Sequence, residues 1–176
     1  MAGMTAEQAI FVNQMYIDAV KRESKATKNV LAAVPADMCE YKPDDFSKTA
    51  IELARHIAAA ECRLLRIPIS GEFDPKGPSP LPESAKTPAE IAAWYEQSAA
   101  ETLEKLSKMT PEQLTKIVDF RGLFQMPAVM YLQFALHHSI HHRGQLSAYL
   151  RAMGGKVPAI YGESYDSAAA KKAAGG

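Results

Sequence analysis

Apolar and polar residues alternate along most of the chain with the period of an α-helix. The pattern predicts four long helices, at about residues 6–34, 49–67, 88–108 and 127–153. Pro35 and Pro68 are expected to end the first two, because proline lacks the backbone N–H that a helix interior needs. A glycine pair, Gly154-Gly155, suits the end of the last helix.

The starts of the helical segments share a capping pattern. A threonine is followed three residues later by Glu or Gln in the segments that begin at Thr5, Thr49, Thr87 and Thr110. In such a capping box the hydroxyl accepts from a backbone amide of the first turn, and the Glu or Gln side chain bonds back to the cap. The last box starts only a short turn, "TPEQL", and the partly β-branched "TKIVDFRGLF" after it is predicted to be extended or irregular.

Four long helices joined by connections of mixed length predict an all-α fold, a four-helix bundle. The 176 residues, of which 47% are hydrophobic and 23% charged, suit one globular domain over residues 1–176. Its core is expected at about residues 6–162, and the tail "DSAAAKKAAGG" is expected to fray.

Charge and cysteine content narrow the class of protein. Twenty basic residues balance twenty acidic ones, without the basic excess of a dedicated nucleic-acid-binding protein. Cys39 and Cys62 are too few for a disulfide framework and lack a zinc-binding spacing. The sequence shows no secretory signal pattern and no apolar run of membrane-spanning length. We therefore expect a cytoplasmic protein with neither a nucleic-acid nor a membrane partner.

Four of the five histidines fall within "HHSIHHRGQL", residues 137–146. With His138 at 0° and about 100° per residue, His142 lies at about 40°, within the apolar face of the helix. His137 lies at about 260°, on the polar face, and His141 lies at the border. The periodicity therefore predicts that His138 and His142 point inward and that His137 is exposed.

The fifth histidine, His56, borders the apolar stripe of "IELARHIAAAECRLL". Taken singly, His56 fits a hydrogen-bonded core histidine, and "HHSIHH" fits a surface cluster. Three imidazoles that point into one interior are hard to satisfy as neutral polar groups, whereas a divalent metal would satisfy all of them. Two histidines four residues apart on a helix can share a metal, and a third leaves coordination positions open. We favour a site formed by His56, His138 and His142.

Three further polar residues are candidates for roles beside such a site. Gln145 lies near His138 on the helical wheel and would either contact bound water or substrate, or be an ordinary residue at the helix border. Glu61 and Arg143 fall within the apolar faces of their helices. Glu61 would either accept a hydrogen bond from a ligating imidazole or form an ion pair with Arg143. Gln145 and Glu61 are thus the candidate catalytic residues.

The segments "LARHIAAAECRLL" and "HHSIHHRGQLSAYLRAMGGKVPAIYG" resemble the DinB/YfiT-like family, whose name refers to DNA-damage induction. The resemblance covers about residues 15–162, and its signature H-x-x-x-H-R-G-Q starts here at His138. It implies a four-helix bundle with an up-down-down-up path and often a homodimer. It also implies one divalent metal ion, zinc or nickel, with His56, His138 and His142 as ligands.

The same resemblance implies a class of reaction. Relatives include thiol S-transferases that use low-molecular-weight thiols such as bacillithiol, and a mycothiol-dependent isomerase. Neutral histidine ligands leave the metal charge uncompensated, so a bound water or thiol loses its proton more readily. We expect a metal-dependent enzyme, of the thiol transferase or hydrolase kind, that activates a small thiol or water against a small electrophilic substrate. The alternative is a non-catalytic metal-binding stress-response protein, which a fourth protein ligand would favour.

Overall fold

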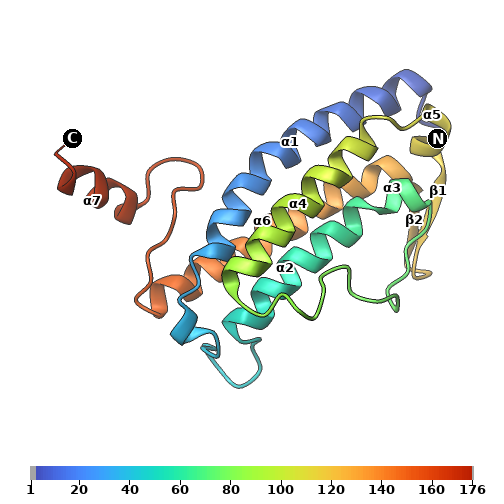
Figure 1. The fold of residues 1–176 in the computed structure, drawn as a ribbon. Helices are drawn as coiled ribbons and strands as arrows, with labels where there is room; N and C mark the ends of the chain where they lie inside the picture. Colours follow the sequence, from blue (N-terminus) through green and yellow to red (C-terminus); the bar gives the residue numbers. More distant parts are fainter. Residues whose placement is uncertain (1–2, 176) are drawn as a thin grey trace.

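The computed structural model describes residues 3–175, most of which are helical (Figure 1). The long helices are α1 (Ala6–Ala32), α2 (Ala50–Leu65), α4 (Pro88–Leu106) and α6 (Tyr131–Ala152). The all-α prediction is confirmed at this level, with one small addition, a two-stranded hairpin. Within the described residues, none of the helices combines the length and hydropathy needed to cross a membrane.

The long helices lie side by side (Figure 1). Both α1 and α2 pack against α4 and α6, and the most extensive contact joins α2 to α6. Apolar side chains from all four long helices fill the space between them in two clusters. One cluster contains Leu53, Ile57, Tyr95 and Leu146, and the other contains Ile17, Leu65, Leu106 and Leu132. The pairing of α2 with α6 decides which side chains can form a common site.

All four predicted capping boxes are present. Thr5, Thr49, Thr87 and Thr110 each accept from the backbone of the third helical residue, whose side chain bonds back to the cap. The last of them starts the short helix α5 (Pro111–Thr115). Helix α6 has no side-chain cap and follows directly from a 3₁₀ turn, η2 (Ala128–Met130). Another 3₁₀ turn, η1 (Ala36–Met38), follows α1.

The second long helix ends at Leu65, close to the predicted end at Ile67, but Pro68 does not stop helical structure. A short helix, α3 (Ile67–Ser70), begins directly after α2 and contains Pro68 in its first turn. A proline there costs no hydrogen bond, because the first N–H groups of a helix have no partner within it. Helix α3 instead ends before Gly71, whose positive φ of +71° favours glycine.

The segment after α5 forms an antiparallel hairpin of β1 (Ile117–Phe120) and β2 (Phe124–Pro127). Its turn contains two residues with positive φ, Arg121 and Gly122. The carboxylate of Asp119 accepts a hydrogen bond from the backbone of Gly122 and so stabilises the turn. The sequence left this segment open between extended and irregular, and it is extended.

Most of the tail that was expected to fray is helical in the structure. It forms helix α7 (Tyr165–Ala173), which lies apart from the long helices in Figure 1. Ser164 caps the helix, and Ser167 bonds back to the cap. Asp166 ties its first turn to the main body by accepting from Arg151 and from the backbone of Val157. The capping signal was missed because serine, and not Glu or Gln, stands at the third helical position.

Candidate metal centre

His56 on α2 meets His138 and His142 on α6. The Nε2 atoms of His56 and His138 lie 3.2 Å apart. The ring centroids of the three histidines are separated by 4.5–5.0 Å. One ring nitrogen from each of the three lies within 4.8 Å of the others, close enough to bind one ion. The three-histidine cluster expected from the sequence is therefore present.

The helix-face prediction for the other histidines also agrees with the structure. His137 and His141 are exposed, whereas His56, His138 and His142 are half-buried. Residues four apart in a helix lie one above the other, so His138 and His142 face α2 together. His141 stands beside the cluster, with its ring centroid 4.8 Å from that of His142.

The surroundings keep two of the imidazoles neutral at pH 7. Burial, followed by the charges of His142, His56 and His141, lowers the pKa of His138 to about 4. Burial, followed by the charges of His142 and Lys48, also lowers the pKa of His56. A neutral imidazole has a nitrogen lone pair free for a metal, so His56 and His138 can bind a cation without first losing a proton.

The hydrogen bonds of the cluster fit a metal better than they fit isolated core histidines. The two facing Nε2 atoms can share only one proton. The Nδ1 atom of His138 is buried and has no hydrogen-bond partner among the described residues. A cation between the rings would replace the poor contact between the Nε2 atoms, because each could then donate its lone pair to the cation. The residues present therefore fit a divalent metal.

Gln145 contacts the cluster through His142. The Oε1 atom of Gln145 lies 3.0 Å from Nδ1 of His142 and can only accept, so Nδ1 carries the proton. This leaves the Nε2 lone pair of His142 free. The Nε2 group of Gln145 donates to the hydroxyl of Tyr149 at 3.4 Å. Gln145 therefore orients a candidate ligand, a role that neither interpretation of the sequence included.

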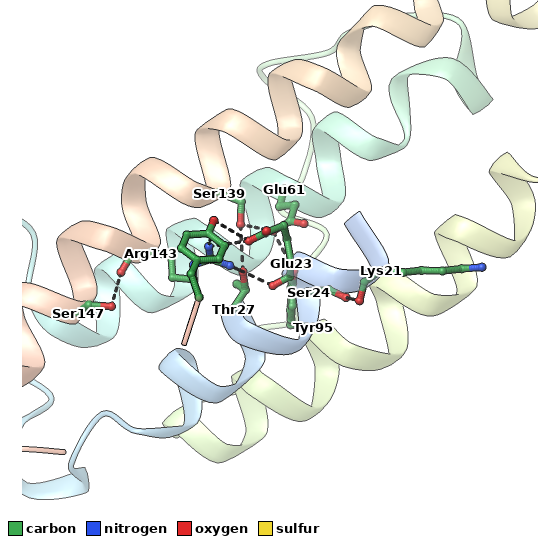
Figure 2. Close-up of polar contacts among 10 residues, drawn as sticks. Lys21, Glu23, Ser24, Thr27, Glu61, Tyr95, Ser139, Arg143 and Ser147 are labelled. Carbon is green, nitrogen blue, oxygen red and sulfur yellow. Dashed lines mark hydrogen bonds and ion pairs between the residues drawn. The ribbon is translucent and has the colours of Figure 1, made fainter. Parts of the chain in front are cut away.

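Glu61 and Arg143 are both buried, as their helix faces predicted, but they do not pair with each other. Arg143 forms an ion pair with Glu23 of α1 at 2.6 Å (Figure 2). Glu61 accepts hydrogen bonds from the hydroxyls of Tyr95 and Ser139, and it bonds to none of the three imidazoles. Neither partner considered for Glu61, Arg143 or a ligating imidazole, bonds to it in the structure. The helical wheel gives the face of a residue but not the neighbour that faces it.

Only weak signals in the sequence point to these partners. Glu23 lies in a lysine-rich stretch of α1 that reads as a solvated surface. Tyr161, whose hydroxyl contacts both Arg143 and Glu23, belongs to the irregular segment before α7. Ser139 stands between the histidine pairs, and only its position next to His138 draws attention to it.

A groove elsewhere on the molecule is separate from the histidines. It has a volume of about 620 Å³ and lies between α1 and α4, lined by Lys21, Arg22, Lys25 and Lys28 among others. An ion pair between Lys28 and Glu96 spans it. None of the three clustered histidines lines this groove, so it adds nothing to the candidate metal centre.

Comparison with known proteins decides the family. A model described as "DinB family" matches residues 9–173. The chain belongs to the DinB family. The resemblance inferred from the histidine segments is thereby confirmed, and it extends beyond the residues that first indicated it.

Two Bacillus subtilis proteins are related in sequence to this DinB chain. YjoA is 28% identical over 130 residues, which cover 73% of the chain and 82% of YjoA. YrdA is 37% identical over 84 residues, which cover 47% of the chain and 48% of YrdA.

Two crystal structures described as DinB-like are similar in fold. YjoA from Bacillus subtilis matches with a TM-score of 0.67 at 23% identity, over 85% of this chain and 99% of that one. A protein from Bacillus cereus matches with a TM-score of 0.68 at 26% identity, over 83% of this chain and 95% of that one. These similarities support the helical fold of the DinB chain.

Proposed function

We propose that this DinB-family protein is a metal-dependent enzyme in which His56, His138 and His142 hold one divalent ion. It would activate a low-molecular-weight thiol, or water, for attack on a small electrophilic substrate. The observation that carries the proposal is the cluster itself, three imidazoles with ring nitrogens within 4.8 Å of one another. Imidazole ligands suit zinc and nickel, the two ions we favour.

The chain's own residues prepare the site for such an ion. The lowered pKa values of His56 and His138 keep both rings neutral, and Gln145 directs the free lone pair of His142 to Nε2. When bound, a divalent ion with neutral ligands would supply Lewis acidity, which lowers the pKa of a thiol or a water molecule. A thiol transferase needs this effect because the thiolate, and not the thiol, attacks electrophiles.

The composition of the cluster favours an enzyme over a non-catalytic metal-binding stress-response protein. Structural zinc is usually closed by four protein ligands. Among residues 3–175, the group of potential ligands contains only these three half-buried histidines. A divalent ion held by three protein ligands would keep at least one coordination position for water or a small molecule.

The proposal includes the finer expectations from the family resemblance. The long helices would follow an up-down-down-up path, which is consistent with α2 and α6 packing directly against each other. The protein would act in the cytoplasm as a homodimer, without a nucleic-acid or membrane partner. Light scattering during size-exclusion chromatography would test the dimer, since a monomer at micromolar concentration would contradict it.

A spectroscopic titration tests the thiol-transferase function. Protein loaded with cobalt or nickel would be titrated with a small thiol such as cysteine or N-acetylcysteine. A thiol that binds through sulfur should add a charge-transfer band, which should grow as pH rises because the ligand is the thiolate. Turnover of an electrophile such as a chlorodinitrobenzene would then support a transferase. If no thiol changes the spectrum at any pH at which metal stays bound, hydrolysis or a non-catalytic role remains.

A further inference from the structure

Each long helix contributes one buried polar side chain to a common point inside the protein, which we call the four-helix node. Its members are Thr27 of α1, Glu61 of α2, Tyr95 of α4 and Ser139 of α6 (Figure 2). The carboxylate of Glu61 accepts from the hydroxyl of Tyr95 at 2.9 Å and from that of Ser139. The hydroxyl of Ser139 also lies 3.4 Å from that of Thr27.

The four-helix node lies next to the histidines in sequence on both helices that carry them. Glu61 follows His56 by five residues on α2, a rise of about 7.5 Å. Ser139 directly follows His138 on α6 and precedes His142 by three residues. The bond between Glu61 and Ser139 therefore joins α2 to α6 within about two turns of all three imidazoles.

The hydrogen bond between Ser139 and Glu61 restricts the position of α6 against α2 more than an apolar contact would. Apolar side chains pack in several arrangements of similar free energy, whereas a hydrogen bond needs a defined distance and direction. Glu61 and Ser139 are each 1% exposed, so losing the bond leaves buried polar groups unpaired. Any slide or rotation of α2 against α6 that separated the imidazoles would also break this bond.

A second polar contact holds α6 one helical turn further along. Arg143 directly follows His142, and its guanidinium bonds to the carboxylate of Glu23 and to the hydroxyl of Thr27, both on α1. The hydroxyl of Tyr161 covers this ion pair and bonds to both partners. Because Thr27 contacts both Ser139 and Arg143, the contacts to α1 and α2 form one connected network (Figure 2).

We propose that Glu61 and Ser139 are positioning residues of the metal site. Their hydrogen bond fixes the rotation and axial register of α2 against α6, so that the nitrogens of His56, His138 and His142 meet at one point. Neither residue contacts the metal or the substrate. The inference rests on the proposed function, because it assumes that the three imidazoles bind a metal.

Cobalt binding tests this role. Ser139→Ala removes the donor, and we expect it to weaken cobalt affinity roughly 10–100-fold, the usual effect of losing a group that orients ligands. The visible spectrum of bound cobalt should change as well, because the ligand geometry changes. Glu61→Ala should act in the same way. Glu61→Gln should keep most of the affinity and the spectrum, because its amide oxygen can still accept from Ser139 and Tyr95.

A matched control separates positioning from general stability. Asn13 of α1 is also buried, and its side chain donates to the backbone of Leu106 at 2.9 Å. It lies fourteen residues from Thr27 on α1, or about 21 Å. Asn13→Leu should lower the midpoint of chemical denaturation while leaving the cobalt affinity and spectrum unchanged. All variants would be compared where circular dichroism shows them folded. Wild-type affinity and spectrum in Ser139→Ala would overturn the proposal.

A measurement without metal separates failure of this inference from failure of the proposed function. In the apo protein, nuclear Overhauser contacts between the rings of His56 and His138 should be present, since their centroids lie 5.0 Å apart. They should weaken in Ser139→Ala and persist in Asn13→Leu. If wild-type protein binds no cobalt at the histidines, the proposed function fails, while the ring contacts still decide the positioning role. If Ser139→Ala keeps these contacts, the positioning role fails whatever the metal result.

Discussion

Nδ1 of His142 donates a hydrogen bond to Oε1 of Gln145, 3.0 Å away and three residues further along α6. The bond fixes the proton on Nδ1 and leaves the lone pair on Nε2 of His142 free to bind a cation. A metal-bound histidine usually needs such an acceptor on its other nitrogen. Here the acceptor comes from the same helix, so the orientation of His142 depends little on packing between helices.

Gln145→Ala should weaken metal binding roughly tenfold, because His142 loses the acceptor that sets its tautomer and ring orientation. Gln145→Glu should retain wild-type affinity, because a carboxylate also accepts from Nδ1. Competition with a chromophoric chelator would measure both. Gln133→Ala, a change of the same kind earlier on α6, is the control and should leave affinity unchanged. Equal affinities in Gln145→Ala and Gln133→Ala would rule out this role.

The helix faces make a sharp prediction for neighbouring histidines. His142→Ala should lose most of the bound metal, because it removes one of three ligand candidates. His137→Ala should keep its metal, since His137 is exposed and lies outside the three-histidine cluster. Elemental analysis of both purified variants provides the comparison. Equal loss in the two variants would mean that the face assignment does not decide metal binding.

Removal of Glu23 should destabilise the protein by about 3 kcal/mol, at the low end for a stranded buried charge. The Arg143 side chain is only 2% exposed, so Glu23→Ala leaves a buried charge without its counterion. The loss stays at the low end because the Glu23 side chain itself is 18% exposed. Chemical denaturation of the apo protein would measure the free energy of unfolding.

A surface ion pair provides the control for that measurement. Lys28 and Glu96 also lie 2.6 Å apart, but their side chains are 36% and 59% exposed. Glu96→Ala should therefore cost less than about 1 kcal/mol, because solvent screens such pairs. Similar losses in Glu23→Ala and Glu96→Ala would show that burial does not strengthen the dependence of Arg143 on Glu23.

The apo protein should lose stability as pH rises through the titration of Glu61. Burial raises the pKa of this carboxyl from 4.5 to about 7, and the hydrogen bonds from Ser139 and Tyr95 offset only part of the effect. Between these values the folded chain keeps a proton that the unfolded chain has released, so the free energy of unfolding falls as pH rises. The fall amounts to about 3 kcal/mol, since one pKa unit corresponds to about 1.4 kcal/mol.

Glu61→Gln isolates this titration from all others. The difference in free energy of unfolding between wild type and Glu61→Gln should be greatest in favour of wild type near pH 4. It should shrink by about 3 kcal/mol by pH 8, because glutamine does not titrate. Urea denaturation of both apo proteins at several pH values would measure it. Parallel pH profiles for the two proteins would show that Glu61 titrates near its ordinary pKa.

The sequence was informative where a feature depends on local spacing. The threonine capping boxes involve residues three apart, and the inward pair of His138 and His142 involves residues four apart, so both follow from helix geometry. His56 was assigned to the cluster from its helix face and from the family resemblance. These local rules account for the helix starts and for the composition of the three-histidine cluster.

The sequence was uninformative where a feature depends on which segment packs opposite. Arg143 pairs with Glu23, which is 120 residues away, and the wheel could not distinguish this carboxylate from that of Glu61. The helical wheel places Gln145 near His138, whereas its side chain bonds to His142 in the structure. The contact depends on a side-chain rotamer, which the periodicity of the sequence does not determine. The cap of α7 was missed because Ser167 replaces the usual Glu or Gln.

The central claim is that one divalent ion binds between α2 and α6. Its most direct test is a zinc titration of chelator-treated protein, monitored by isothermal titration calorimetry. We predict saturation at one ion per chain in wild type. Replacing one histidine from each helix, as in the double variant His56→Ala and His138→Ala, should abolish this binding while the double variant His137→Ala and His141→Ala retains it. The absence of stoichiometric binding in wild type, or its persistence without His56 and His138, would contradict a metal centre formed between α2 and α6.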